Sequence, residues 1–71
     1  MTPSTFHPGD LVVLTGKGCD RPAVELMAIW TVVKFRGNQV IVKFEPEKQT
    51  VEGLEELGFR NFPVSWLVLY H

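Results

Sequence analysis

The Gly37-Asn38 dipeptide is the sequence feature that most restricts the fold of this chain. It stands between two runs rich in β-branched and aromatic residues, 30–35 and 40–44. A two-residue loop with glycine at its first central position, where φ must be positive, is typical of a tight turn between antiparallel strands. The sequence therefore predicts a β-hairpin in which Arg36 lies opposite Gln39.

Strand alternation assigns the side chains of this hairpin to two faces. The predicted buried face is largely apolar and consists of Thr31, Val33, Phe35, Val40, Val42 and Phe44. The predicted outer face mixes cations with apolar side chains and consists of Trp30, Val32, Lys34, Arg36, Gln39, Ile41 and Lys43. In this register Val33 lies opposite Val42, and a slip by one residue would exchange the two sets.

Segment 23–35 fits two interpretations. Residues 22–29 suit a helix, because Asp20 can cap it, Pro22 falls in its first turn, and Ala, Glu, Leu and Met favour helix. A strand competes, because the second half of the segment is rich in β-branched and aromatic residues and leads directly into the hairpin. We favour a strand across most of the segment.

Glycine and proline mark the remaining elements. The Pro8-Gly9-Asp10 turn leads into a predicted strand at Leu11–Leu14. Two further strands are predicted at 59–62 and 67–70, joined by a tight turn at 63–66 that would supply a one-turn helix before the last strand. An acidic segment follows the hairpin, and within it Thr50 and Gly58 could cap a short helical turn over 51–57.

Five short strands with frequent turns predict an all-β fold, a small five-stranded antiparallel SH3-like barrel with at most one short helical turn. The 71 residues are predicted to form one domain, 1–71. A chain of this length buries only about 60% of the surface that its unfolded form exposes. Because 45% of the residues are apolar, we expect part of the apolar surface to meet a partner, either another copy in a homo-oligomer or a different protein.

Charge and composition exclude several classes of protein. The formal net charge is −1, which argues against a protein devoted to the phosphate backbone of nucleic acid. No apolar run exceeds five residues, the length of 26–30, so no membrane span is expected. The first residues lack the pattern of a secretory signal, which predicts a cytoplasmic protein. Cys19 is the single cysteine, so no disulfide forms within one chain.

Four segments form a pattern: Phe6-His7-Pro8-Gly9-Asp10-Leu11-Val12-Val13-Leu14, Arg21-Pro22-Ala23-Val24, Val40-Ile41-Val42-Lys43-Phe44 and Phe62-Pro63-Val64-Ser65-Trp66-Leu67-Val68. Their spacing resembles that of small SH3-like bacterial proteins. They resemble a family of uncharacterised proteins that begin F-x-x-G-D-x-V-x-L and end with F-P-x-x-x-L. The chain departs from that family at its G-G-P-x-M turn, where it has Asp20-Arg21-Pro22-Ala23-Val24. The resemblance implies an SH3-like fold and no particular activity.

Two further resemblances involve enzymes. Thr5-Phe6, Gly9-Asp10 and Phe62-Pro63-Val64 are similar to segments of the type II plasmid dihydrofolate reductases, SH3-like chains that assemble as tetramers around a pore. Their catalytic V-Q-I-Y stretch would fall on residues 59–62, which read Phe-Arg-Asn-Phe, so that activity is not implied. Gly9-Asp10-Leu11-Val12 and Arg21-Pro22-Ala23-Val24 resemble landmarks of the longer MazF-type endoribonuclease toxins.

The chain lacks a clear catalytic or metal-binding motif. His7 and His71 lie at opposite ends, and Cys19, near Lys17 and Arg21, has no adjacent histidine. Asp10 follows a glycine at a turn, where its expected role is local hydrogen bonding. The glutamates of the acidic segment lack the spacing of a calcium loop, and Gly16 and Gly18 are not followed by G-K-[ST]. We therefore expect no catalytic residue, no metal and no cofactor.

The outer face of the hairpin is the predicted binding site, with Trp30, Lys34, Arg36, Ile41 and Lys43 as its residues. Met27, Ile29 and Val32 are the predicted oligomer surface, and Trp66 and Tyr70 are expected to close the core. These features predict a non-enzymatic interaction module that binds proteins or itself. The alternatives are a nucleic-acid-binding or MazF-like endoribonuclease module that uses the same face, and a small oligomeric enzyme with a pore lined by Arg60 and Asn61.

Overall fold

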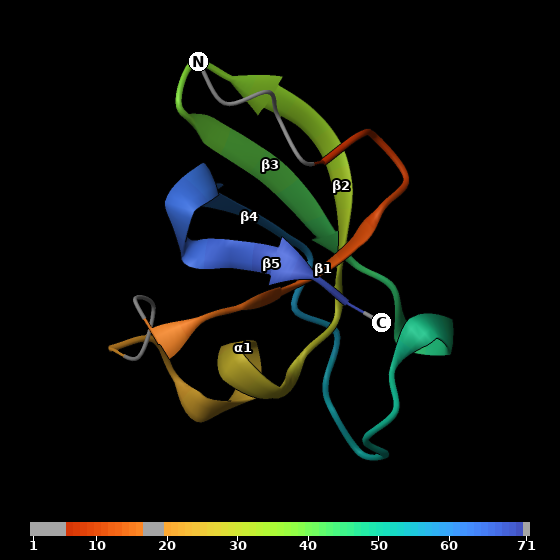
Figure 1. Cartoon of the computed structure of the whole chain (residues 1–71). Helices are drawn as coiled ribbons and strands as arrows, with labels where there is room; N and C mark the ends of the chain where they lie inside the picture. The colour runs from red at the N-terminus through yellow and green to blue at the C-terminus, as the bar shows by residue number, and fades with distance from the viewer. Residues whose placement is uncertain (1–5, 17–19, 71) are drawn as a thin grey trace.

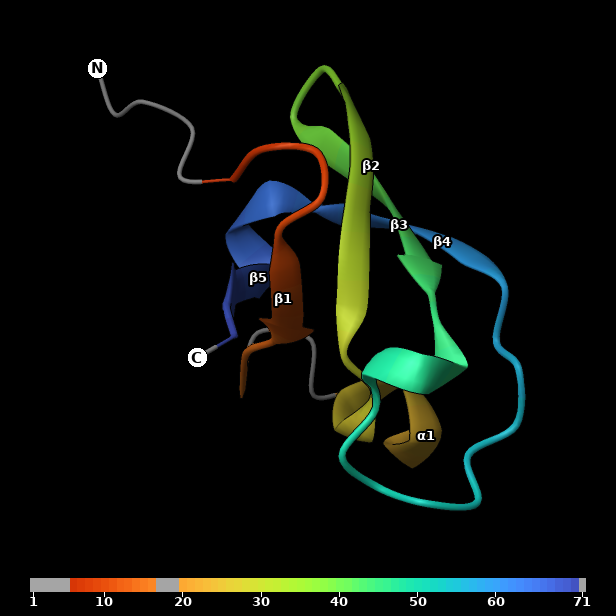
Figure 2. The same cartoon turned by 90° about the vertical axis from the view of Figure 1, so that its right-hand side faces the viewer.

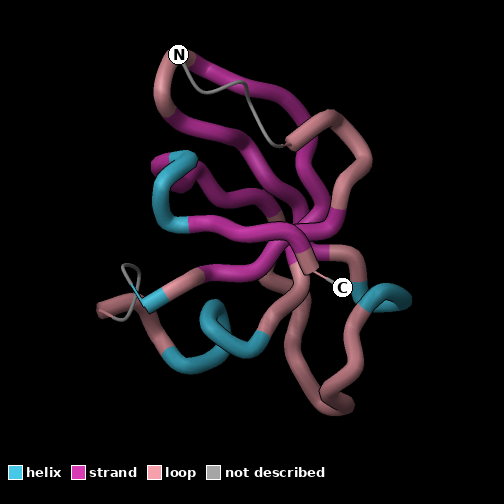
Figure 3. The backbone as a smooth tube through the Cα atoms, in the orientation of Figure 1, coloured by secondary structure: helices cyan, strands magenta, loops and turns pink. Residues whose placement is uncertain are grey.

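The computed structural model describes residues 6–16 and 20–70. Its strands are β1 (Leu11–Leu14), β2 (Trp30–Arg36), β3 (Gln39–Phe44), β4 (Phe59–Pro63) and β5 (Leu67–Leu69). An α-helix, α1 (Ala23–Met27), and two 3-10 turns, η2 (Pro46–Lys48) and η3 (Val64–Trp66), connect them (Figures 1 and 3). All pairs are antiparallel in one sheet of order β4-β3-β2-β1-β5, which confirms the small five-stranded all-β prediction.

The sheet is curved but open. Among the described residues no ladder joins β4 to β5, so these two strands are its edges. The expectation of a closed barrel is therefore met only in its strand count and antiparallel pairing. One short α-helix, α1, forms beside the two 3-10 turns, in keeping with the predicted all-β fold.

The predicted hairpin turn is confirmed. Gly37 has φ of 61°, and since no described residue other than glycine has positive φ, the loop is of the type II′ kind. The next three pairs follow the predicted register: Arg36 with Gln39, Phe35 with Val40, and Lys34 with Ile41. Local turn chemistry therefore determined the pairing near the loop.

Beyond these pairs the predicted register is wrong, because β2 contains a bulge at Val33. Val32, rather than Val33, lies opposite Val42, and Trp30 lies opposite Phe44. A bulge adds one residue to one strand, so side chains beyond it change faces. Val33 is accordingly 38% exposed, whereas Trp30 and Val32 are 0% and 2% exposed. This exchange buries an indole and a valine in place of Thr31 and Val33.

The core lies on the concave side of the sheet around the Trp30 ring. Its centroid is 6.1 Å from that of Phe44 and 5.5 Å from that of Phe62, both in edge-to-face geometry. Such pairs add about 0.5–1.5 kcal/mol to the burial of the rings themselves. The fully buried cluster consists of Phe6, Val12, Ala28, Trp30, Val32, Val40, Val42, Phe44, Phe62 and Leu67.

The predicted closure of the core by Trp66 and Tyr70 holds for one of the two residues. Trp66 packs against the core with its ring 6.3 Å from that of Phe62. Tyr70 is 39% exposed beyond the end of β5. Its ring therefore lies at the surface rather than over the core.

Residues 23–27 form a helix, so the strand favoured for this part of the chain is wrong and the helical alternative is right. The N-cap residue is Pro22, and no side chain caps the helix, which excludes the predicted cap by Asp20. A five-residue helix is too short to be stable alone. It is held by tertiary contacts, among them a hydrogen bond of 3.2 Å that Trp30 Nε1 donates to the Glu25 carbonyl.

The predicted helical turn over 51–57 does not form. Residues 51–53 make a turn, in which Gly53 adopts φ of 85°, and 54–58 are extended or irregular. Just before this segment, the Gln49 side chain holds the chain in place through three hydrogen bonds. Its Oε1 accepts from Ile29 N (2.7 Å), and its Nε2 donates to Ile29 O (2.8 Å) and Glu45 O (2.9 Å). The positive φ of Gly53 interrupts any helix at the middle of this segment.

Candidate functional site

Trp30 does not belong to the binding face to which the sequence analysis assigned it. Its ring is the centre of the core, and its indole N–H is occupied by the Glu25 carbonyl. The physical reason is the bulge at Val33, which turns Trp30 toward the concave side. The predicted aromatic anchor is therefore unavailable to a partner.

The other four predicted residues do lie together. Lys34 pairs with Ile41 across β2 and β3, Arg36 flanks the turn beside them, and Lys43 is two residues further along β3. Val40 and Val42 are buried, so the intervening side chains of β3 point to the convex side of the sheet. We call Lys34, Arg36, Ile41 and Lys43 the basic face.

The cations of the basic face carry unneutralised charge. Lys34, Arg36 and Lys43 are exposed, and none of them forms an ion pair with another described residue. Ile41 is half-buried among them. Three positive charges around an apolar side chain can attract an anionic partner and also exclude water from part of the contact.

Phe59 is a surface residue that the sequence analysis missed. It is 59% exposed at the start of β4 and pairs with Lys43, whose Nζ lies 5.8 Å from the ring centroid. The sequence analysis predicted the strand at 59–62 but did not assign its faces. In the structure, Phe59 and Phe62 point to opposite sides of β4. The β3–β4 register was the missing signal, since it places Phe59 beside the basic face.

Two of the three residues predicted to form an oligomer surface are buried. Ile29 and Val32 are each 2% exposed and belong to the interior. Met27, at 47% exposed, remains accessible on α1. The helix and the bulge together direct the other two side chains inward, so this part of the prediction is wrong.

A buried carboxylate with two guanidinium partners was also missed. Glu25 is 3% exposed, and Arg21 binds it through Nε (2.7 Å to Oε1) and Nη2 (3.1 Å to Oε2). Arg60 Nε donates to Oε2 at 3.0 Å, and Arg60 Nη1 donates to the carbonyls of Leu57 (2.5 Å) and Phe59 (2.9 Å). Arg60 thereby ties α1 to β4, which are 35 residues apart at these positions.

The environment of Glu25 keeps it charged. The hydrogen bond from Arg21 is the largest cause that lowers the pKa of this carboxyl; burial opposes it, and Arg60 reinforces it. The group is therefore a fixed anion within a guanidinium pair rather than a proton donor near neutral pH. Its contacts are those of a structural tether between a helix and a strand.

Arg60 and Asn61, which the sequence analysis considered as a pore lining, point to opposite sides of β4. Arg60 shares the concave side with Val42, its partner on β3, whereas Asn61 pairs with Ile41 and is exposed on the convex side. They do not form one wall of a site within this chain.

The remaining candidates have local roles or lie outside the described residues. Asp10 Oδ2 accepts from His7 N at 2.8 Å, and Asp10 N donates to His7 O at 2.9 Å, which closes the turn before β1 as expected. Lys17, Cys19 and His71 fall outside the part of the chain that the structure describes. Within that part, no group of three or more His, Cys, Asp or Glu could hold a metal ion.

In residues 6–16 and 20–70, no helix has the length and apolar character needed to cross a lipid bilayer. Comparison with protein-family models, curated proteins and solved structures gives no significant match.

Proposed function

We propose that this protein is a non-enzymatic SH3-like binding module whose basic face binds an acidic segment of a protein partner. The observation that supports the proposal is the set of three exposed cations, Lys34, Arg36 and Lys43, without a carboxylate partner among the described residues. They stand on paired strands with a well-defined register, so a partner meets a preformed surface.

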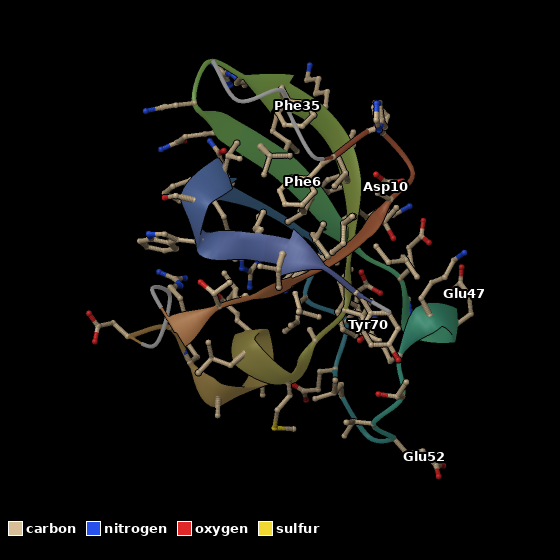
Figure 4. All side chains as sticks on the ribbon, viewed as in Figure 1. Phe6, Asp10, Phe35, Glu47, Glu52 and Tyr70 are labelled. Carbon is tan, nitrogen blue, oxygen red and sulfur yellow. The ribbon has the colours of Figure 1, made fainter. Side chains whose placement is uncertain are left out.

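The distribution of acidic residues supports the same partner chemistry. The chain as a whole has a net charge of −1. Glu47 and Glu52 lie away from the β2–β3 turn (Figure 4). These two carboxylates are thus separated from the turn that Arg36 flanks. Such a separation orients an incoming anionic segment toward the basic face and away from the 47–56 segment.

The proposal is tested by titrating a short labelled peptide of alternating Glu and Leu and measuring fluorescence anisotropy. The Lys34→Glu/Lys43→Glu double variant should weaken binding by about tenfold or more. Lys48→Glu is the matched control, because Lys48 is exposed on η2, away from the basic face, and should change binding little. Equal effects of the two variants, or no binding by the unmodified chain, would refute the proposal.

Phe59 favours a second candidate, single-stranded nucleic acid. An exposed ring beside a lysine is a surface on which a base can stack while the cation meets a phosphate. Phe59→Ala should then weaken binding of an oligothymidylate by about fivefold to a hundredfold, with a steep salt dependence. Binding of the acidic peptide should tolerate this variant, so the same change separates the two functions.

A further inference from the structure

The outer edge of β4 has a defined pattern of hydrogen-bonding groups. Phe44 N donates to Gly58 O (2.8 Å), and Val64 N donates to Asn38 O (3.0 Å), at the two ends of the regular β3–β4 ladder. Hydrogen-bonded pairs alternate along an antiparallel ladder. The backbone groups of Arg60 and Phe62 therefore bond to β3, and those of Phe59, Asn61 and Pro63 point to the free edge.

The groups on this edge can be assigned one by one. Asn61 offers both its N–H and its carbonyl, and Phe59 offers its N–H. The Phe59 carbonyl already accepts a hydrogen bond from Arg60 Nη1 at 2.9 Å. Pro63 offers its carbonyl but has no N–H to donate. The edge thus lacks one donor and has one carbonyl that already has a partner.

We infer that the partner of this edge is a second copy of the chain, paired antiparallel through β4 about a two-fold axis at Asn61. In that register Asn61 lies opposite Asn61 of the second copy, and the two exchange both backbone hydrogen bonds. Phe59 lies opposite Pro63 of the second copy, and its N–H donates to the carbonyl of that proline.

The self-pairing accounts for the irregular features of the edge. The donor that Pro63 lacks would have bonded to the Phe59 carbonyl of the other copy, and that carbonyl is the one that Arg60 already binds. Proline on an edge strand usually blocks pairing. Here the missing N–H coincides with the occupied carbonyl, so no backbone group of the pair is left without a partner.

The side chains on the convex side fit the same arrangement. Phe59, at 59% exposed the most exposed large hydrophobic side chain of residues 6–16 and 20–70, would lie between Lys43 of its own copy and Pro63 of the second. The two Asn61 carboxamides face each other across the axis and can each donate and accept. Among the described residues β4 is an edge strand that is bonded within the sheet to β3, and in Figure 2 its ribbon runs out to the right-hand side of the molecule.

The other edge of the sheet is a poorer candidate. β5 has three residues against five in β4. Its ladder with β1 places the backbone groups of Leu67 and Leu69 on the free side, since Thr15 N bonds to Trp66 O and Tyr70 N to Leu11 O. A pairing there would be shorter and would leave Phe59 exposed.

This inference does not rest on the proposed function, because it uses neither Lys34 nor Arg36. Pairing through β4 leaves the acidic-partner proposal intact, while it removes Phe59 from the nucleic-acid candidate. The paired edges are short, so we expect a weak dimer with a Kd on the order of 100 µM.

Sedimentation equilibrium over a range of concentrations tests the dimer. The unmodified chain should dimerise, and Asn61→Lys should be monomeric because it sets two ammonium groups against each other at the axis. Val68→Lys is the matched control: Val68 is 48% exposed on β5, at the opposite edge of the sheet, so the same charge is added away from β4, and the dimer should persist. Circular dichroism checks that both variants are folded.

Nuclear magnetic resonance then locates the contact. In a mixture of labelled and unlabelled chains, the proposed register predicts an intermolecular contact between the Hα protons of Arg60 and Phe62, which form a non-hydrogen-bonded pair across the interface. A monomer at millimolar concentration, a dimer that survives Asn61→Lys, or intermolecular contacts confined to other elements would each overturn the inference.

Discussion

Trp30 Nε1 donates a hydrogen bond of 3.2 Å to the main-chain carbonyl of Glu25, and this bond joins the core to α1. The indole is fully buried between the rings of Phe44 and Phe62, so its N–H has no access to water. The Glu25 side chain meanwhile binds Arg21 and Arg60. One helical residue therefore connects the centre of the core with both guanidinium groups.

Replacing Trp30 with phenylalanine should destabilise the protein by about 2–3 kcal/mol. The variant loses about 1 kcal/mol for the hydrogen bond and leaves the Glu25 carbonyl without its donor, and it also leaves a cavity beside Phe62. Urea unfolding followed by circular dichroism measures the loss. Phe59→Leu, at an exposed position, is the control and should change the midpoint little. An unchanged midpoint in Trp30→Phe would show that the indole N–H contributes nothing.

The hairpin was predictable because its determinants are local. Gly37 supplies the positive φ that the loop requires, and the three pairs next to it follow from the loop length. The bulge at Val33 has no comparable local signal. It arises because Trp30 and Val32 pack against side chains from β1, β3 and β4, and a period-two pattern in a single strand contains no information about those contacts.

The candidate site was predictable to the same extent. Lys34, Arg36 and Lys43 were placed on one surface because they lie close to the loop or on the regular strand β3. Phe59 and the Glu25 tether depend on pairings between distant segments, β3 with β4 and α1 with β4. A single sequence does not contain that information in its periodicity, and Glu25 in particular looks like an ordinary surface residue of a helix.

The bulge predicts opposite effects at two adjacent valines. Val33→Ser should change stability by no more than about 0.5 kcal/mol, because the side chain is 38% exposed. Val32→Ser should cost about 2 kcal/mol or more, because it buries a hydroxyl in the core and leaves a cavity. Urea midpoints of the two variants provide the comparison. If Val33→Ser destabilised the protein more than Val32→Ser, the register without a bulge would be the correct one.

Glu25 should make the protein sensitive to acid. Its pKa is lower in the folded chain than in the unfolded chain, so its contribution is fully present above the unfolded value, about 4.3, and is lost as pH falls through the folded value. Glu25→Gln should therefore cost about 2 kcal/mol at pH 7, where the charge-assisted bonds are lost. The difference from the unmodified chain should shrink below about pH 4.

Urea unfolding at neutral and acidic pH checks this dependence. Glu55→Gln serves as the control, because Glu55 is exposed and forms no ion pair with a described residue. A Glu25→Gln variant whose deficit is the same at both pH values would show that the carboxylate charge does not stabilise the fold.

The Gln49 carboxamide should be required to hold the segment that follows β3. It accepts from Ile29 N and donates to two carbonyls, those of Ile29 and Glu45. Gln49→Glu has nearly the same shape, but it replaces the donor with an oxygen that faces both carbonyls. We expect a loss of about 2 kcal/mol and faster amide hydrogen exchange at Ile29 and through residues 45–50. Glu47→Gln alters an exposed side chain of the same segment and should leave this exchange unchanged. Slow exchange at Ile29 in Gln49→Glu would mean that the loop is held by other contacts.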